Sequence, residues 1–166
     1  EPEGKVFAEL KKKYDGVVYK RRITVPAAQV QPLLAGQLPL ADYGQIGREI
    51  AWFQQLYSAV PRVFIGYDRI AFAGVEDPEL RITFDTNIRW RTTGLDLCAG
   101  DAGAPLLPDD RVLLELKLPG VCPLWLAHGL ADAKALPVSF SKYGSCYCHH
   151  LLRQQPVTLK EVFPCA

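Results

Sequence analysis

The sequence predicts an α+β fold, in which helices pack outside an antiparallel β-sheet. Alternating, extended segments open the 166-residue chain, helical segments follow, and this order then repeats. Turn residues such as Tyr14-Asp15-Gly16 join neighbouring extended segments, and connections this short favour antiparallel strands. Hydrophobic residues make up 49% of the chain and charged residues 22%, which is typical of a globular domain rather than of a disordered chain.

The phrase Glu-Leu-Lys occurs twice, at Glu9-Leu10-Lys11 and at Glu115-Leu116-Lys117, each time within an otherwise apolar extended segment. Residues two apart in a strand share a face and lie about 6.6 Å apart, so each phrase places a carboxylate beside an ammonium group. Because an isolated ion in a dry interior is very costly, we expect each charged face to meet solvent, a paired network or a wet cavity that holds an ion.

The first phrase lies in the first strand of a predicted hairpin. After the turn, the extended segment from Val17 to Val25 places Lys20 and Arg22 on one face. Two helical stretches are expected next. The first opens at Pro26 and ends near Gly36.

The second predicted helix is longer and amphipathic. Asp42 is its expected N-cap, and apolar residues at helical spacing continue to about Val60. Pro61 ends it, because proline cannot donate a backbone hydrogen bond.

Two further extended segments form a second predicted antiparallel pair, followed by a loop, the second Glu-Leu-Lys strand and two helices. In the first of the pair Arg69 shares a face with Tyr67, and in the second Arg81 shares a face with Thr83, Asp85 and Asn87. In chain order, the predicted elements are extended segments at Val63–Ala73 and Leu80–Arg91, a loop at Cys98–Asp110, a strand at Val112–Lys117, and helices at Pro123–Ala135 and Ser139–Gly144.

Basic residues outnumber acidic ones on the predicted charged faces. Arg presents a bidentate fork to phosphate oxygens and Lys a mobile point charge, while a divalent cation bridges carboxylate and phosphate oxygens, so these faces suit a polyphosphate. A solvated sheet edge carries the same residue types and remains an alternative. If the sheet closes into an eight-stranded barrel, the charged faces line its lumen. The residues concerned are Lys11, Lys20, Arg22, Arg69, Arg81 and Lys117, with Glu9 and Glu115.

An ordered set of motifs carries a family resemblance. The segments VFAELKKKYDGVVYKRR, YDRIAF, RITFDTNIRWR, VLLELKLPG and SFSKYG resemble the vacuolar transporter chaperone (VTC) domain, the polyphosphate polymerase domain of the triphosphate tunnel metalloenzyme (CYTH-like) superfamily. The resemblance covers nearly the whole chain up to about Tyr147. It implies a tunnel of eight antiparallel strands with helices outside, in which inward Lys and Arg residues hold a triphosphate and an acidic residue binds Mn²⁺ or Mg²⁺.

The resemblance also implies roles for individual residues. Glu115 matches the metal-binding glutamate, whereas Glu9 is interpreted as a partner of the neighbouring lysines rather than a metal ligand. Lys142 matches a basic residue near a tunnel mouth. The implied phosphate-binding residues are Lys11, Lys20, Arg22, Arg69, Arg81, Lys117 and Lys142, and those implied in catalysis are Lys11, Lys20, Arg69, Arg81 and Lys142.

Family members begin well before the predicted hairpin, with a further region that contributes tunnel strands. The chain starts at Glu1 and contains no Met, so we expect a fragment: a partial VTC domain at residues 1–152, without its N-terminal strands, and a C-terminal tail at residues 153–166. Such a fragment holds only part of the tunnel wall, which leaves its independent activity open.

The implied function is metal-dependent phosphoryl transfer from a nucleoside triphosphate to a polyphosphate chain within a basic tunnel. A triphosphatase that uses water as acceptor, a non-catalytic domain that binds polyphosphate or other anions, and a solvated face without a ligand are the alternatives. The expected partners are nucleoside triphosphate and polyphosphate. Nucleic acid is not expected, because a net charge of +1 provides little electrostatic attraction for it.

The sequence excludes several other classes of site and location. It contains no Walker-type phosphate loop and no nucleophile elbow. No apolar run approaches the roughly 18 residues that span a bilayer, so we expect a soluble, cytoplasmic domain, and a membrane-associated partner is left open. Five cysteines indicate reduced thiols. Cys146, Cys148, His149 and His150 are a candidate soft-metal cluster, but without a second ligand pair we favour incidental helix or loop residues.

Overall fold

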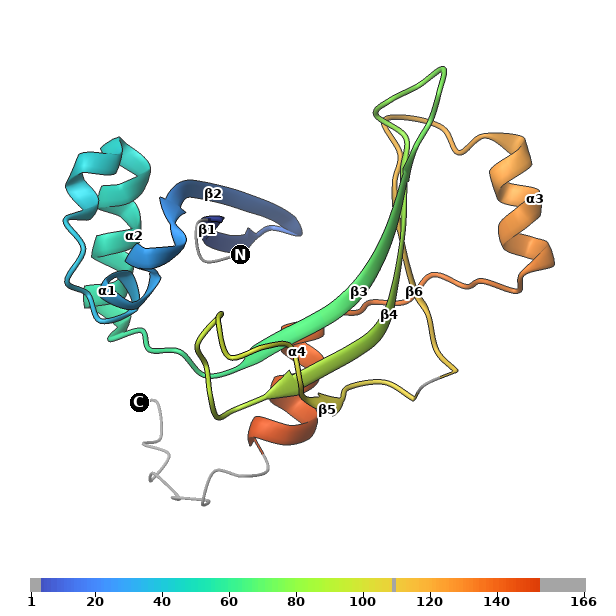
Figure 1. The fold of residues 1–166 in the computed structure, drawn as a ribbon. Coiled ribbons are helices and arrows are strands. Elements are labelled where there is room, and N and C mark those ends of the chain that lie inside the picture. Colours follow the sequence, from blue (N-terminus) through green and yellow to red (C-terminus); the bar gives the residue numbers. More distant parts are fainter. Residues whose placement is uncertain (1–3, 109, 153–166) are drawn as a thin grey trace, which may run out of the picture. The chain divides into compact units, whose positions relative to one another are not determined.

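The computed structural model describes residues 4–108 and 110–152, which divide into two compact units (Figure 1). The hairpin unit lies within Glu1–Val63 and Thr92–Gly100, and the sheet unit lies within Phe64–Arg91 and Asp101–Ala166. The predicted tail at residues 153–166 lies outside the described residues.

The hairpin unit begins with the predicted hairpin, which is confirmed. Strands β1 (Lys5–Tyr14) and β2 (Val17–Pro26) pair antiparallel. Asp15 and Gly16 join them with positive φ angles of 47° and 76°, the backbone that a two-residue type I′ turn requires at both positions. The turn therefore fixes the pairing register of the two strands.

Two helices pack on one side of this hairpin (Figure 1). A 3₁₀ turn at Ala27–Gln29 leads into α1 (Val30–Leu34), and a second 3₁₀ turn at Leu40–Tyr43 leads into α2 (Gly44–Tyr57). Both predicted helices are thus present. Buried apolar side chains from the strands and helices form the core of the unit, namely Leu10, Ile23, Val25, Val30, Leu33, Leu40 and Ile50.

Both ends of the longer helix differ from the prediction. Asp42 is not its N-cap: it lies inside the 3₁₀ turn, and Tyr43 occupies the N-cap position without a side-chain hydrogen bond. The positive φ of 71° at Gly44 separates this turn from α2 and moves the start of the helix past Asp42. The helix ends at Tyr57 because Ser58 adopts the left-handed conformation, three residues before Pro61.

The sheet unit is built on a four-stranded antiparallel sheet in which β4 is central. The two long predicted strands and the second Glu-Leu-Lys strand are confirmed within one residue at their ends. A short strand also forms within the segment predicted as a loop, where it pairs with Arg89 and Trp90 of β4. The strands are β3 (Phe64–Ala73), β4 (Arg81–Arg91), β5 (Ala104–Pro105) and β6 (Leu113–Lys117).

The register of this sheet aligns its charged residues. Arg69 of β3 lies opposite Asp85 of β4, and Glu115 of β6 lies opposite Thr83. Asn87 was predicted on the face of Asp85, and this was wrong. A β-bulge interrupts the register at Gly66/Asp68, and Asn87 has a positive φ of 47°, so the alternation breaks there and the amide binds Asp68.

Helices contact the sheet at opposite faces. In α3 (Leu124–Asp132), Trp125 lines an apolar pocket together with Phe72 and Ile82. In α4 (Lys142–Cys146), Lys142 contacts the charged face at Asp85, and a π-helical turn follows at Tyr147–Leu151. The last predicted helix begins later than expected, because Ser141 is extended and caps α4 by accepting a hydrogen bond from the Gly144 backbone N–H.

The α+β class with antiparallel sheets is confirmed. Within the described part of the chain the strands form one two-stranded and one four-stranded sheet, and the closed eight-stranded tunnel stays a prediction. None of the described helices is long and apolar enough to cross a lipid bilayer.

A close backbone approach in the hairpin unit makes Gly47→Ala destabilising. A Cβ at Gly47 would collide with the carbonyl oxygen of Leu40 and lie 2.8 Å from the Tyr43 Cβ. We expect a loss of about 1–3 kcal/mol in the free energy of unfolding, measured by urea denaturation. Gly129→Ala in α3 is the control: nothing lies within 4 Å of the added carbon, so helix propensity predicts a gain of up to about 1 kcal/mol. Equal effects at both sites would contradict the close approach.

Candidate anion-binding site

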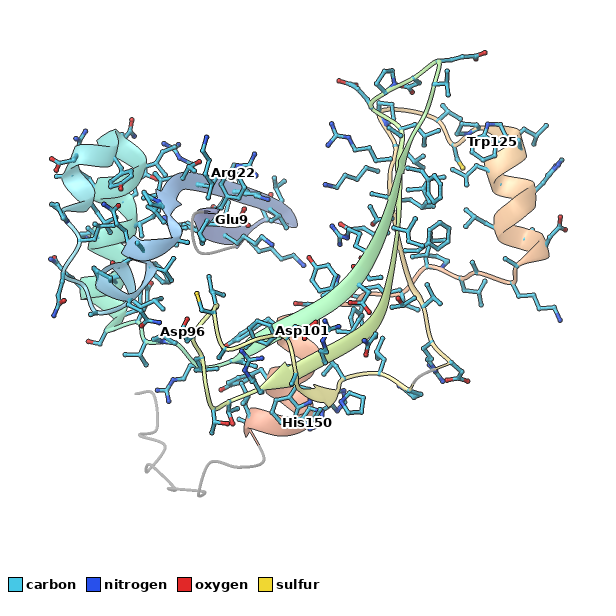
Figure 2. All side chains as sticks on the ribbon, viewed as in Figure 1. Glu9, Arg22, Asp96, Asp101, Trp125 and His150 are labelled. Carbon is cyan, nitrogen blue, oxygen red and sulfur yellow. The ribbon has the colours of Figure 1, made fainter. Side chains whose placement is uncertain are left out.

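The hairpin presents one charged face, opposite its packed face. Lys11 and Lys20 lie directly across the two strands from each other, and Glu9 lies across from Arg22 (Figure 2). The Glu9 carboxylate accepts from Lys20 Nζ at 2.7 Å and pairs with Lys11 Nζ at 3.4 Å. Arg22 stacks over the ring of Phe7, 4.4 Å from its centroid. Two lysines therefore pair with the Glu9 carboxylate, and a third cation, Arg22, occupies the opposite register position.

The electrostatics of this face favour an ionised Glu9. Partial burial raises the pKa of Glu9, but the hydrogen bonds and charges of Lys20 and Lys11 outweigh it, so the pKa lies below its ordinary value. Glu9 thus stays a carboxylate at neutral pH and occupies donors of both lysines.

The sheet unit gathers a second charged cluster around Asp85. The Asp85 side chain is fully buried. Arg69 donates two hydrogen bonds to its carboxylate, from Nε at 2.6 Å and from Nη2 at 2.7 Å. Lys142 Nζ adds a contact of 2.6 Å to the Asp85 Oδ2 atom. Glu115 stands at the edge of the cluster, where its carboxylate lies 3.5 Å from Arg69 Nη2.

Hydrogen bonding from Arg69 lowers the pKa of Asp85, and Lys142 lowers it further, against the opposing effect of burial. The pKa of Arg69 is raised in turn, chiefly by its hydrogen bonds to Asp85. Both partners are therefore fully charged at neutral pH, as a buried carboxylate with two cations requires.

Tyr67 supports both cations of this cluster. The Arg69 guanidinium lies 4.9 Å and the Lys142 ammonium 4.5 Å from the centroid of the Tyr67 ring. A cation over an aromatic face is attracted by the negative potential of the ring. One tyrosine thus contacts two cations that come from β3 and α4.

Arg81 and Lys117 extend the charged face along the sheet. They lie directly opposite each other on β4 and β6, and both are exposed. Within residues 4–108 and 110–152 neither of them forms an ion pair. Like charges directly opposite each other destabilise a sheet, so this rung favours an anion between the two side chains.

The structure thus sorts the predicted residues into two sets. Lys11, Lys20 and Arg22 share the hairpin face, and the sheet face holds the other five. The members of the sheet set are Arg69, Arg81, Glu115, Lys117 and Lys142. Whether both sets line one tunnel stays a prediction.

Two residues of the cluster were missed as site residues. In RITFDTN, Asp85 lies two residues after Thr83 and four after Arg81, so strand alternation already placed it on the basic face. In YDRIAF, Tyr67 shares the face of Arg69 for the same reason. Pattern alone does not say that Asp85 is buried or that Lys142 reaches it from a helix.

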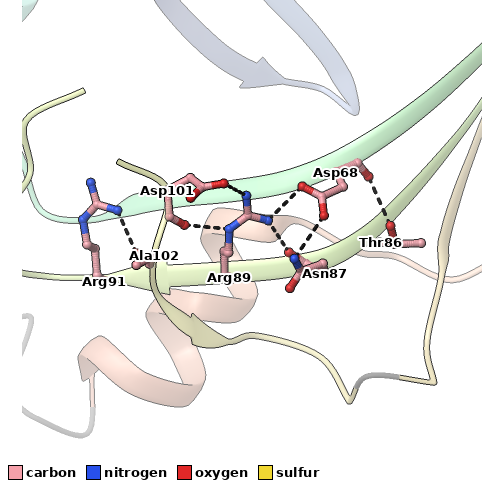
Figure 3. Close-up of polar contacts among 7 residues, drawn as sticks. All are labelled: Asp68, Thr86, Asn87, Arg89, Arg91, Asp101 and Ala102. Carbon is pink, nitrogen blue, oxygen red and sulfur yellow. Dashed lines mark hydrogen bonds and ion pairs between the residues drawn. The ribbon is translucent and has the colours of Figure 1, made fainter. Parts of the chain in front are cut away.

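A separate polar network holds the loop after β4 against that strand (Figure 3). Arg89 donates to the Asp101 backbone oxygen at 2.6 Å and to the Asp68 carboxylate at 3.1 Å. Asn87 donates to the same carboxylate, and Arg91 donates to the backbone oxygen of Ala102. Asp68 and Asp85 occupy adjacent pairing positions on different faces, so this network is structural and distinct from the Asp85 cluster.

The side chains of the sheet face could hold a divalent cation only if a bound ligand supplied some of the coordinating oxygens. Among the described residues, no group of three or more His, Cys, Asp or Glu side chains is arranged to hold a metal ion. Asp85 is occupied by two cations, whereas the Glu115 side chain is 48% exposed on the same face. Mg²⁺ commonly binds through one or two carboxylates plus substrate phosphates, and Glu115 suits that mode.

The predicted Cys and His cluster is not arranged as a metal site among the residues described. Cys146 is buried, and burial raises the pKa of its thiol. His150 stacks on Trp90 with a centroid separation of 4.3 Å. Cys146 and His150 therefore contribute to packing.

The whole chain was compared with known proteins and protein families. A search of curated proteins found no match to the chain. A family model described as the VTC domain matches residues 1–150, which include both charged faces and nearly all of the chain. The predicted resemblance is confirmed, and the chain belongs to the VTC domain family.

Proposed function

We propose that this VTC domain binds the phosphate chain of polyphosphate and of a nucleoside triphosphate on its basic strand faces. We further propose that the protein containing it transfers phosphoryl groups from the nucleotide to polyphosphate in a metal-dependent reaction. The observation that carries the proposal is the sheet face, where Arg69 and Lys142 converge beside the exposed Arg81–Lys117 rung. The association of the VTC family with polyphosphate polymerases supports it.

The cluster keeps donors available for phosphate. Arg has five N–H donors and Lys three, and the contacts to Asp85 use only some of them. Arg81 and Lys117 are exposed, so their donors are accessible from solvent. A linear triphosphate carries several negative charges, which the free donors of the cluster and the two cations of the adjoining rung would bind.

Phosphoryl transfer requires no nucleophilic side chain, because positioning and electrostatic stabilisation supply most of the catalysis. In this proposal the cations of the sheet face hold the phosphates and neutralise charge that develops on the transferred group. Lys11, Lys20 and Arg22 supply the same chemistry on the hairpin face. Glu115 would hold Mn²⁺ or Mg²⁺ together with phosphate oxygens, and the cation would withdraw charge from the phosphoryl group.

Two related functions use the same face. Water as acceptor in place of polyphosphate would make the protein a triphosphatase. A domain that only binds polyphosphate would need no metal. Turnover of a nucleoside triphosphate by the full-length protein, with the product identified as polyphosphate or free phosphate, separates the three functions.

Binding of tripolyphosphate to the 166-residue chain tests the proposed site directly. In excess chelator we expect calorimetry to detect binding that weakens as salt is raised, because the contacts are ionic. Arg81→Gln/Lys117→Gln should weaken it at least about tenfold, since hydrogen bonds to charged groups contribute about 1.5–3 kcal/mol each.

The matched control is Arg48→Gln/Lys134→Gln, which removes the same net charge from two exposed positions off this face. It should bind almost as tightly as the wild-type chain. Equal losses in both double variants would show that net charge, and not the site, governs binding. Absence of binding by the wild-type chain would reject the proposed function.

A further inference from the structure

Asp85 is a negatively charged residue on the face that we propose binds phosphate, where a negative charge is unexpected. It lies on the central strand β4, its side chain is 0% exposed, and it is the one buried charged residue in the described part of the chain. Its carboxylate sits among cations that the proposed function assigns to phosphate. A negative charge there opposes anion binding, so its presence calls for a compensating role.

The contacts of Asp85 indicate that role. Its two oxygens accept from Arg69 Nε and Nη2 and from Lys142 Nζ, all within 2.7 Å. Arg69 comes from the neighbouring strand β3, and Lys142 is the first residue of α4. Two cations brought this close would repel each other, and the shared carboxylate offsets that repulsion.

The same contacts restrict the conformations of both side chains. The bidentate pair fixes the plane of the Arg69 guanidinium, because its fork matches the carboxylate. Lys142 is held between Asp85 and the ring of Tyr67. Long basic side chains lose substantial rotamer entropy when a ligand orders them, and side chains ordered in advance avoid that loss on binding.

We propose that Asp85 is a positioning residue, which holds Arg69 and Lys142 in one shared arrangement so that their remaining donors meet the phosphate chain together. The inference rests on the proposed function and adds a role for a residue that does not touch the ligand. It also gives α4 a function: its first residue completes a site on the sheet.

Charge and positioning predict opposite effects for Asp85→Asn. Removal of a negative charge from a basic site should by itself strengthen the binding of an anion. Loss of the shared arrangement should weaken binding, because Arg69 and Lys142 would then have to be ordered by the ligand. The sign of the change in tripolyphosphate affinity therefore separates a positioning role from a purely electrostatic one.

The experiment is calorimetric titration of tripolyphosphate into the 166-residue chain in excess chelator. We expect Asp85→Asn to bind about tenfold more weakly than wild type, the size implied by ordering two long side chains. In the Arg69→Gln/Lys142→Gln background, the further change Asp85→Asn should strengthen binding, because only the charge effect remains. Urea denaturation establishes that the wild-type chain and the three variants are folded, and among folded chains such a reversal of sign would not follow from a structural role.

Two carboxylates serve as controls. Glu76→Gln removes the same charge from an exposed position between β3 and β4 and should bind tripolyphosphate about as tightly as wild type. Asp68→Asn disturbs another arginine–carboxylate pair, outside the face, and should leave the affinity unchanged.

Equal or tighter binding by a folded Asp85→Asn chain would overturn the positioning role while leaving the proposed function intact. Failure of the wild-type chain to bind would instead overturn the proposed function, and the positioning role with it. If circular dichroism shows Asp85→Asn to be unfolded, Asp85→Glu keeps the charge and displaces the carboxylate by one methylene. It should bind several-fold more weakly, and unchanged affinity would overturn the role.

Discussion

Glu115→Gln is expected to lower metal-dependent phosphoryl transfer by the full-length protein at least about a hundredfold, because a bound metal ion contributes several kcal/mol of transition-state stabilisation. Glutamine keeps the size of the side chain and removes the charge that a hard divalent cation prefers. Glu115 is the exposed carboxylate of the sheet face, whereas Asp85 is occupied by Arg69 and Lys142. The measurement is polyphosphate formation from ATP across a series of Mn²⁺ concentrations.

The second Glu-Leu-Lys phrase has its own matched control in the first. Glu9 pairs with Lys11 and Lys20, so Glu9→Gln removes the same charge from a carboxylate that we do not assign to metal. It should leave the Mn²⁺ dependence of the reaction unchanged. Product formation by Glu115→Gln at the wild-type rate and metal dependence would reject the metal assignment.

Asp85→Ala is expected to lower the free energy of unfolding by about 3 kcal/mol. Removal of one partner from a buried ion pair typically costs about 3–5 kcal/mol, and the 36% exposure of the Arg69 side chain places the expected loss at the lower end. Urea denaturation at neutral pH measures it. Asp68→Ala breaks a pair with Arg89 in which the carboxylate side chain is 58% exposed, and it should cost much less than Asp85→Ala because solvent screens the pair.

The same ion pairs predict a pH dependence of stability. Because Arg69 and Lys142 lower the pKa of Asp85 in the folded state, its ionisation stabilises the fold. That stabilisation is fully present above the ordinary pKa of an aspartate, about 3.9, and is lost as the pH falls through the lower folded-state value. The stability difference between wild type and Asp85→Asn should therefore be constant from pH 7 to about pH 5 and shrink below about pH 4. A difference that grows with acidity would contradict the lowered pKa.

Strand alternation and turn chemistry are local signals, and they predicted the sheet architecture well. The alternation around Arg69 and Arg81 located both long strands, and Tyr14-Asp15-Gly16 located the hairpin turn. Features that depend on backbone conformation at single residues were not predicted. The start of α2 at Gly44 and the break in strand alternation at Asn87 both accompany positive φ angles, and neither glycine nor asparagine always adopts a positive φ.

The basic set on the charged faces was also predicted from pattern, because residues two apart in a strand must share a face. The pairing within that set was not. Alternation predicts which residues of one strand share a face, but it does not predict that Asp85 of β4 pairs with Arg69 of β3. Lys142 belongs to a helix far along the chain. The strand register and the packing of α4 decide that these three side chains meet.

The sequence by itself therefore determined the fold class, the family and the residue types of the charged faces, since these depend on periodicity and on ordered motifs. Only the tertiary structure decided which charges are neutralised by ion pairs and which remain exposed to solvent. Burial and distance set the strength of an ion pair, and both arise when separate elements come together. Glu9 and Glu115 lie in the same three-residue phrase, yet the first is held by two lysines and the second remains half exposed beside an arginine.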